Sequence, residues 1–263
     1  MKSRFEKQGL TVRIVGRDRL DLTQRGQTVG TVFLENLRDI CARQSATACE
    51  DAKVRRVQGQ REVTGGDHDR VALAQVRTVV RPTSYLRAIE KQLRQTNPSN
   101  TPEEQRKLRE GTPISRPLGP DFVVALVQDT GNNMLAISAS SLKTSDLSQG
   151  ELERVGTANL RHEHIRPLVA DADHASIYVT EGNDYLSSVL IDEPFWHRVA
   201  GPLAGKDVSV CMPARHELFV YVPSLDPKGG VNFTNACRAL AQNAAPTFSD
   251  RVVRRVNGRW LFN

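Results

Sequence analysis

The chain has 263 residues, of which 39% are hydrophobic and 25% are charged, a composition typical of a folded globular protein. The formal net charge is +6, but acidic residues are spread among the basic ones and only 5% of the residues are aromatic. This argues against a nucleic-acid-binding surface, which concentrates basic and stacking side chains. No run approaches the roughly 20 apolar residues that a membrane-spanning helix needs.

Residues 1–119 predict an N-terminal α+β lobe. Apolar and polar side chains alternate over residues 10–15, as in a half-buried strand. The elements predicted in this lobe are strands over 10–15, 19–22, 27–33 and 71–80, helices over 35–43 and 84–94, and a loop over 58–69. Residues 95–119 are rich in charge, asparagine and proline, and predict a polar linker at the end of the lobe, within which residues 101–104 have the pattern of a helix start with proline in the first turn.

Residues 120–263 predict a C-terminal α+β lobe. Its predicted elements are strands over 122–128, 134–138, 176–180, 208–212, 218–222, 252–256 and 259–262, and helices over 148–162, 187–203 and 232–242. Asn257-Gly258 is the strongest hairpin signal in the chain. Strand-strand-helix units recur near residues 10–43, 122–162 and 208–242. The predicted fold class is therefore α+β, with mostly antiparallel sheets and helices on one face.

The four cysteines fall into two local pairs, Cys41 with Cys49 and Cys211 with Cys237. Cys211 closes a predicted strand and Cys237 lies on the next predicted helix, so packing of the two elements brings them within disulfide reach. Two disulfides would indicate an oxidising compartment. The alternative is four thiols, with Cys211 and Cys237 as small core residues. No CxxC pattern is present, which argues against zinc or thioredoxin-like chemistry.

No motif for a catalytic serine, a phosphate loop, a dinucleotide site or a zinc protease is present, so the sequence predicts no catalytic residue and no cofactor. The weak metal candidates are His162, His164 and His174, because His-x-His on a strand places both rings on one face. A polar surface turn explains the same residues.

Six polar residues are the candidates for a ligand site. Asp184 and Tyr185 precede a predicted helix, either as a capping turn or as a loop facing an anion. Ser249, Asp250 and Arg251 could form a hydroxyl–carboxylate–guanidinium cluster, although no histidine base accompanies the serine. Arg81 follows a predicted strand and completes the set.

An ordered set of segments resembles the YtpQ-like family, a bacterial family classed as a domain of unknown function. The segments are residues 79–85, 113–114, 116–118, 122–129, 158–161, 183–190, 210–215, 246–251 and 257–260. The resemblance extends over about residues 10–262 and implies a fold and a bacterial source. It implies no activity, so no catalytic residue follows from it.

The sequence therefore favours a non-enzymatic binding or protein-interaction module whose partner is another protein. The alternatives are a hydrolase-like enzyme with an unfamiliar polar site and, third, a nucleic-acid binder acting through diffuse charge. Residues 1–9 are polar and resemble no secretory signal. Together with the cysteine pairs, this leads us to expect the mature form of a periplasmic or secreted protein, with a cytoplasmic location as the alternative.

Overall fold

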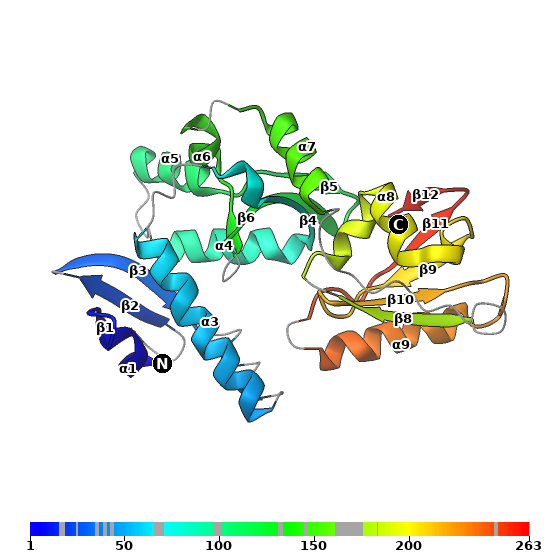
Figure 1. The fold of residues 1–263 in the computed structure, drawn as a ribbon, viewed down its shortest axis with the longest axis horizontal. Helices are drawn as coiled ribbons and strands as arrows, with labels where there is room; N and C mark the ends of the chain where they lie inside the picture. The colour runs from blue at the N-terminus through cyan, green and yellow to red at the C-terminus, as the bar shows by residue number, and fades with distance from the viewer. Residues whose placement is uncertain are drawn as a thin grey trace.

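The computed structural model describes residues 1–15, 19–24, 26–34, 37–38, 41–42, 45–65, 71–96, 101–130, 134–144, 147–160, 176–182, 184–244 and 247–262. Over these residues the protein is an α+β fold with three antiparallel sheets, which confirms the predicted fold class (Figure 1). No helix in these ranges has both the length and the apolar character needed to cross a membrane.

The first sheet belongs to an N-terminal unit with its own core (Figure 1). Its elements are β1 (Thr11–Val15), β2 (Arg19–Gln24) and β3 (Gln27–Phe33), paired in that order, with α1 (Lys2–Glu6) and α3 (Ala46–Gly65). Phe5, Leu22 and Val32 are fully buried in this core. The three strands are as predicted, and along β1 the alternating pattern matches a sheet with one buried face.

Helix α3 overturns the predicted loop over residues 58–69, since the helix continues to Gly65. The segment has no continuous apolar stripe, and Ala52 and Val57 are the buried apolar residues described on α3. A segment without such a stripe lacks the periodic signal by which helices are found in a sequence.

The second sheet is built around β6, which pairs with three strands. Its strands are β4 (Val76–Pro82), β5 (Ser115–Leu118), β6 (Phe122–Asp129) and β7 (Met134–Ala136). Its helices are η1 (Leu73–Gln75), α4 (Thr83–Thr96), α5 (Pro102–Gly111), α6 (Ala139–Thr144) and α7 (Gln149–Leu160). Residues 122–127 of β6 are all buried, as expected of a central strand covered on both faces.

The predicted division of the chain at Gly119 falls inside this sheet, at the turn between β5 and β6, where Gly119 has φ 70°. Both β4 and β5 hydrogen-bond to β6, so a boundary there would cut one sheet in two. The stretch predicted as a polar linker, residues 95–119, contains α5 and β5, so only its predicted helix start near residues 101–104 is confirmed. A charged, amphipathic helix such as α5 resembles a linker in composition alone.

The third sheet has the strand order β12-β11-β9-β10-β8. Its strands are β8 (Ile177–Glu181), β9 (Val208–Cys211), β10 (Glu217–Tyr221), β11 (Val252–Val256) and β12 (Arg259–Leu261). Its helices are η2 (Leu186–Leu190), α8 (Glu193–Ala200), η3 (Gly201–Leu203) and α9 (Gly230–Asn243). The predicted hairpins β9–β10 and β11–β12 are both present.

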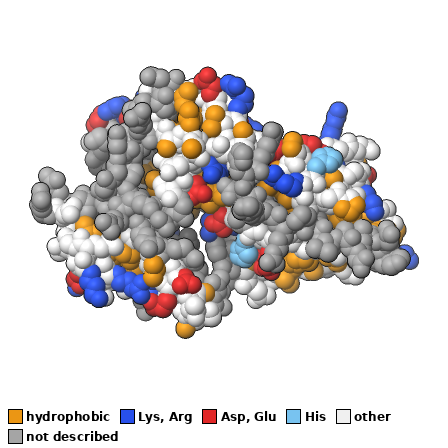
Figure 2. Space-filling model, viewed as in Figure 1, with side chains coloured by type: hydrophobic (Ala, Val, Ile, Leu, Met, Phe, Trp, Pro, Cys, Tyr) orange, Lys and Arg blue, Asp and Glu red, His pale blue; other side chains and the backbone are white. Residues whose placement is uncertain are grey.

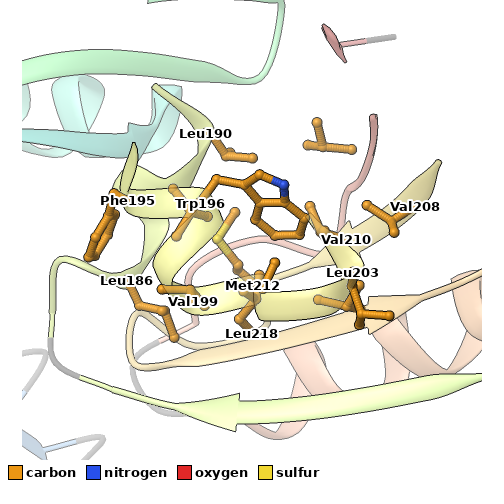
Figure 3. Packing of buried hydrophobic residues seen from close by; sticks show 14 of the residues in the cluster. Leu186, Leu190, Phe195, Trp196, Val199, Leu203, Val208, Val210, Met212 and Leu218 are labelled. Carbon is orange, nitrogen blue, oxygen red and sulfur yellow. The ribbon is translucent and has the colours of Figure 1, made fainter. Parts of the chain in front are cut away.

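Helices cover both faces of the third sheet, whereas the sequence predicted helices on one face. On one face, α8 and η3 pack over Val210 and Leu218, with the Trp196 ring at the centre of the cluster (Figure 3). On the other, α9 packs through Phe233 and Cys237 against Cys211 and Tyr221. Alternation along β9 explains this, because successive residues of a strand point to opposite faces.

The second and third sheets share one core. Val80 and Phe122 of the second sheet belong to the cluster around Trp196, and the rings of Phe122 and Phe248 stack with their centroids 6.1 Å apart. Turn η2 joins the two, since Ser187 Oγ donates to the carbonyl of Val80 at 3.0 Å. A second hydroxyl, on Ser188, donates to the carbonyl of Thr78 at 3.1 Å. These bonds bring the loop before η2 against β4, where the candidate site lies.

Candidate functional site

Arg81 is a buried cation near the end of β4. Its residue is 4% exposed, and its guanidinium donates to the carbonyl oxygens of Val80 at 3.0 Å and Asp184 at 3.3 Å. A further N–H points at the thioether sulfur of Met134, 3.2 Å away, which is a weak acceptor. Burial, and then the charge of Arg215, lower the pKa of Arg81 to about 10, so the side chain is cationic at neutral pH.

Asp184 and Tyr185 lie beside Arg81, so three of the six predicted residues are brought together. The carboxylate of Asp184 is 3.3 Å from Nη1 of Arg215, in the turn between β9 and β10. Tyr185 is buried and its hydroxyl donates to the carboxylate of Asp129. The Tyr185 hydroxyl is thus occupied inside the protein, while Asp184 faces outward through Arg215.

Tyr85, on the first turns of α4, completes this group, which we call the Arg81 cluster: Arg81, Tyr85, Asp184 and Arg215. Burial raises the pKa of Tyr85, and the nearby charges of Arg81 and Arg215 oppose that rise without cancelling it. The phenol therefore stays protonated at neutral pH and can donate a hydrogen bond.

The sequence predictions did not include Arg215 and Tyr85 in a site. Each lies within a segment that carries the family resemblance, residues 210–215 and 79–85. A basic residue in a predicted turn is usually a solvated surface residue, so Arg215 does not stand out in the sequence. Only the docking of η2 on β4 places Arg215 and Tyr85 near Arg81.

Ser249, Asp250 and Arg251 form a second group, before β11, and in the described part of the chain no hydrogen bond or ion pair joins them to the Arg81 cluster. They line an open pocket of about 420 Å³ together with residues from the start of α4 and the end of α9. Nε of Arg251 is 3.5 Å from a carboxylate oxygen of Asp121 and 3.8 Å from one of Asp250. Oγ of Ser249 accepts the backbone N–H of Arg251 at 3.0 Å, which is the geometry of a local turn.

The histidine candidates for a metal site, His162, His164 and His174, lie outside the described residues. Within the described ranges, no group of three or more histidine, cysteine, aspartate or glutamate side chains is placed to hold a metal ion.

Both predicted cysteine pairs form disulfides. The Cα atoms of Cys41 and Cys49 are 4.6 Å apart, and those of Cys211 and Cys237 are 6.1 Å apart. The second bridge ties β9 to α9, as the strand-helix pattern predicted.

Comparison of the chain with known proteins found no similar one: no protein-family model, curated protein or solved structure matches it.

Proposed function

We propose that this is a non-enzymatic binding protein of an oxidising compartment, periplasmic or extracellular, and that it recognises a carboxylate-bearing ligand at the Arg81 cluster. The two disulfides support the compartment, because such bridges persist where thiols are not kept reduced. The chemistry of the cluster supports binding, because its three donors can orient and neutralise an anion.

One observation carries the ligand proposal, namely the way in which Arg81 is buried. Its hydrogen-bond acceptors are two backbone carbonyls and a thioether, and no carboxylate contacts it in the described part of the chain. A buried charge is costly unless an opposite charge accompanies it.

Arg255 provides a comparison within the same protein. It is also 4% exposed, but it is ion-paired with the carboxylate of Glu193 and donates to the carbonyl of Ala204 at 2.7 Å. The buried arginine of the third sheet thus has a carboxylate in direct contact, whereas the carboxylate of Asp184 acts on Arg81 through its charge, without a hydrogen bond.

The charges of the Arg81 cluster favour a monoanion. Two guanidinium groups, on Arg81 and Arg215, accompany one carboxylate, that of Asp184, which leaves one positive charge in excess. A guanidinium presents parallel N–H groups that match the two oxygens of a carboxylate. Arg215 and Asp184 are 37% and 41% exposed at their side chains, so the cluster opens to solvent on their side.

Binding of acetate, succinate and inorganic phosphate, measured by calorimetry and thermal shift at constant ionic strength, tests this proposal. We expect the carboxylates to bind and Arg215→Gln to weaken binding roughly tenfold, because a hydrogen bond to a charged group is lost. Tyr85→Phe removes a neutral donor and should weaken binding about fivefold.

Arg251→Gln is the matched control, since it removes an exposed arginine from the other group of predicted residues. Loss of binding in this variant, with Arg215→Gln unaffected, would move the ligand to the pocket before β11. Stabilisation by carboxylates no greater than by chloride would contradict the proposal.

Membership of the YtpQ-like family stays a prediction and supplies no activity. The hydrolase and nucleic-acid readings stay predictions as well. The Arg81 cluster does not favour a hydrolase, because it brings together hydrogen-bond donors and one ion-paired carboxylate, whereas a hydrolase needs a nucleophile beside a base.

A further inference from the structure

Strand β8 is at the end of the third sheet, with β10 as its hydrogen-bonded neighbour (Figure 1). Two bonds fix which residues face β10: the N–H of Val222 donates to Ser176 and the N–H of Gly182 donates to His216. In an antiparallel pair such bonds recur at every second residue. The even-numbered residues of β8 therefore point their backbone groups at β10, and the odd-numbered ones point theirs away from it, to an edge on which the described residues place no further strand.

The same odd-numbered residues expose their side chains. Ile177 is 46% exposed and Val179 is 52% exposed, whereas Tyr178 and Thr180 are buried. Figure 2 shows hydrophobic side chains among polar ones at the surface of the right half of the molecule, where the third sheet lies. Exposed β-branched side chains on an open edge are the arrangement that natural sheets usually avoid, because it invites pairing with another strand.

An acidic pair marks one end of this edge. Glu181 lies directly opposite Glu217 on β10, in a pair without mutual hydrogen bonds, where side chains come closest. Like charges in that position repel. Nε2 of His216 is 3.9 Å from a carboxylate oxygen of Glu217. No described lysine or arginine forms an ion pair with Glu181.

We infer that the β8 edge receives an extended strand of another protein, one that alternates apolar β-branched residues and carries a lysine or arginine against Glu181 and Glu217. Its backbone would pair with the outward groups of Ile177, Val179 and Glu181, and its apolar side chains would cover Ile177 and Val179. This goes beyond the proposed carboxylate site, because the partner is a protein and is recognised by backbone pairing.

A second copy of the chain fits this edge less well. Residues 176–182 contain no lysine or arginine, so an edge-to-edge β8 pair would add two more glutamates and no cation. Charge complementarity therefore favours a different protein over a symmetric dimer.

Hydrogen exchange of single amides gives the first test. In the protein alone, the amides of Ile177, Val179 and Glu181 should exchange fast and those of Tyr178 and Thr180 slowly. Protection of all five amides in the protein alone would mean that the edge is already covered, and would overturn the inference.

The second test uses a synthetic peptide that alternates valine and threonine and is flanked at both ends by lysine, with a glutamate-flanked peptide as its counterpart. We expect the lysine peptide to bind, to slow exchange at Ile177 and Val179, and to bind roughly tenfold more tightly than the glutamate peptide.

Val179→Pro distinguishes strand addition from nonspecific hydrophobic binding of the peptide. The Val179 N–H faces the open edge, so proline leaves the β8–β10 bonds intact while removing the donor and blocking the approach of a strand. Val179→Thr keeps the N–H and the branched shape, and is the matched control. We expect the proline variant to lose peptide binding and the threonine variant to retain it, at unchanged melting temperatures.

Three results would contradict the inference: equal binding of the two peptides, binding that survives Val179→Pro, or concentration-dependent dimerisation that Val179→Pro abolishes while no peptide binds. The last would assign the edge to a second copy of this chain. None of these results bears on acetate binding at Arg215, so failure here is distinct from failure of the proposed function.

Discussion

At the scale of single residues, the turn between β11 and β12 is set by two backbone conformations. Asn257 has φ 48° and Gly258 has φ 75°, both in the left-handed region that a type I′ turn requires. Asparagine tolerates this region and glycine has no Cβ to oppose it. The backbone N–H of Asn257 also donates to the carboxylate of Asp207 at 2.8 Å, which holds the turn against the start of β9.

We expect Gly258→Val to lower the free energy of unfolding by roughly 1–2 kcal/mol, because a β-branched residue is forced to positive φ. The nearest side-chain atom to an added Cβ is 3.8 Å away, so the cost is conformational rather than steric. Urea denaturation measures it, with Gly258→Asn as the milder control. Equal stability of the valine variant would argue that the turn is not type I′ in solution.

The residue scale also shows what a sequence can and cannot predict about this site. Asp184 and Tyr185 stand out because they precede a helical turn, and Arg81 because it follows a strand. Arg215 approaches Asp184 beside Arg81 because η2 docks on β4. The two hydroxyl hydrogen bonds that hold η2 there join residues 107 and 110 positions apart in the sequence. No local pattern encodes a contact over that distance.

At the scale of elements, turn and cap signals explain which predictions are confirmed. The hairpins β9–β10 and β11–β12 are short apolar-rich runs bounded by turn residues, and α7 begins with a capping box in which Ser148 and Glu151 exchange hydrogen bonds. Helix α3 is missed because its sequence has no continuous apolar stripe. The start of α5 is predicted, but its extent is missed because its charge resembles that of a linker. Elements marked by turn and cap signals are therefore predictable, and highly charged elements without an apolar stripe are not.

The bridge between β9 and α9 should contribute strongly to stability. We expect Cys211→Ala combined with Cys237→Ala to reduce the free energy of unfolding by about 2–4 kcal/mol, because the unfolded chain regains the freedom of a loop with a sequence separation of 26. Chemical denaturation measures the change, and wild type treated with reductant is the control. Equal midpoints for the oxidised, reduced and alanine proteins would show that the bridge adds nothing.

At the scale of the whole molecule, the second and third sheets share a core while the N-terminal unit has a separate one. Each of these two parts contains one disulfide. Oxidation thus stabilises both parts, which fits a protein that works where no reductant is supplied.

Alkylation of the protein in its native compartment, followed by intact-mass analysis without reduction, measures this directly. We expect no alkylated cysteine. Alkylation of all four cysteines would contradict the extracytoplasmic proposal, while leaving the carboxylate and strand proposals to their own tests. Recombinant protein oxidised in vitro is the control for complete bridging.

Both bridges join cysteines that follow one another along the chain. Four cysteines allow three pairings, and this is the one in which neither loop crosses or encloses the other. Under the proposed export, with the N-terminus leading, Cys41 and Cys49 are presented together long before Cys211 emerges. A thiol oxidase acting on each pair in turn therefore produces the native connectivity. Rearrangement of mispaired bridges by slow thiol–disulfide exchange is unnecessary, so maturation should depend on an oxidase and proceed without a disulfide isomerase.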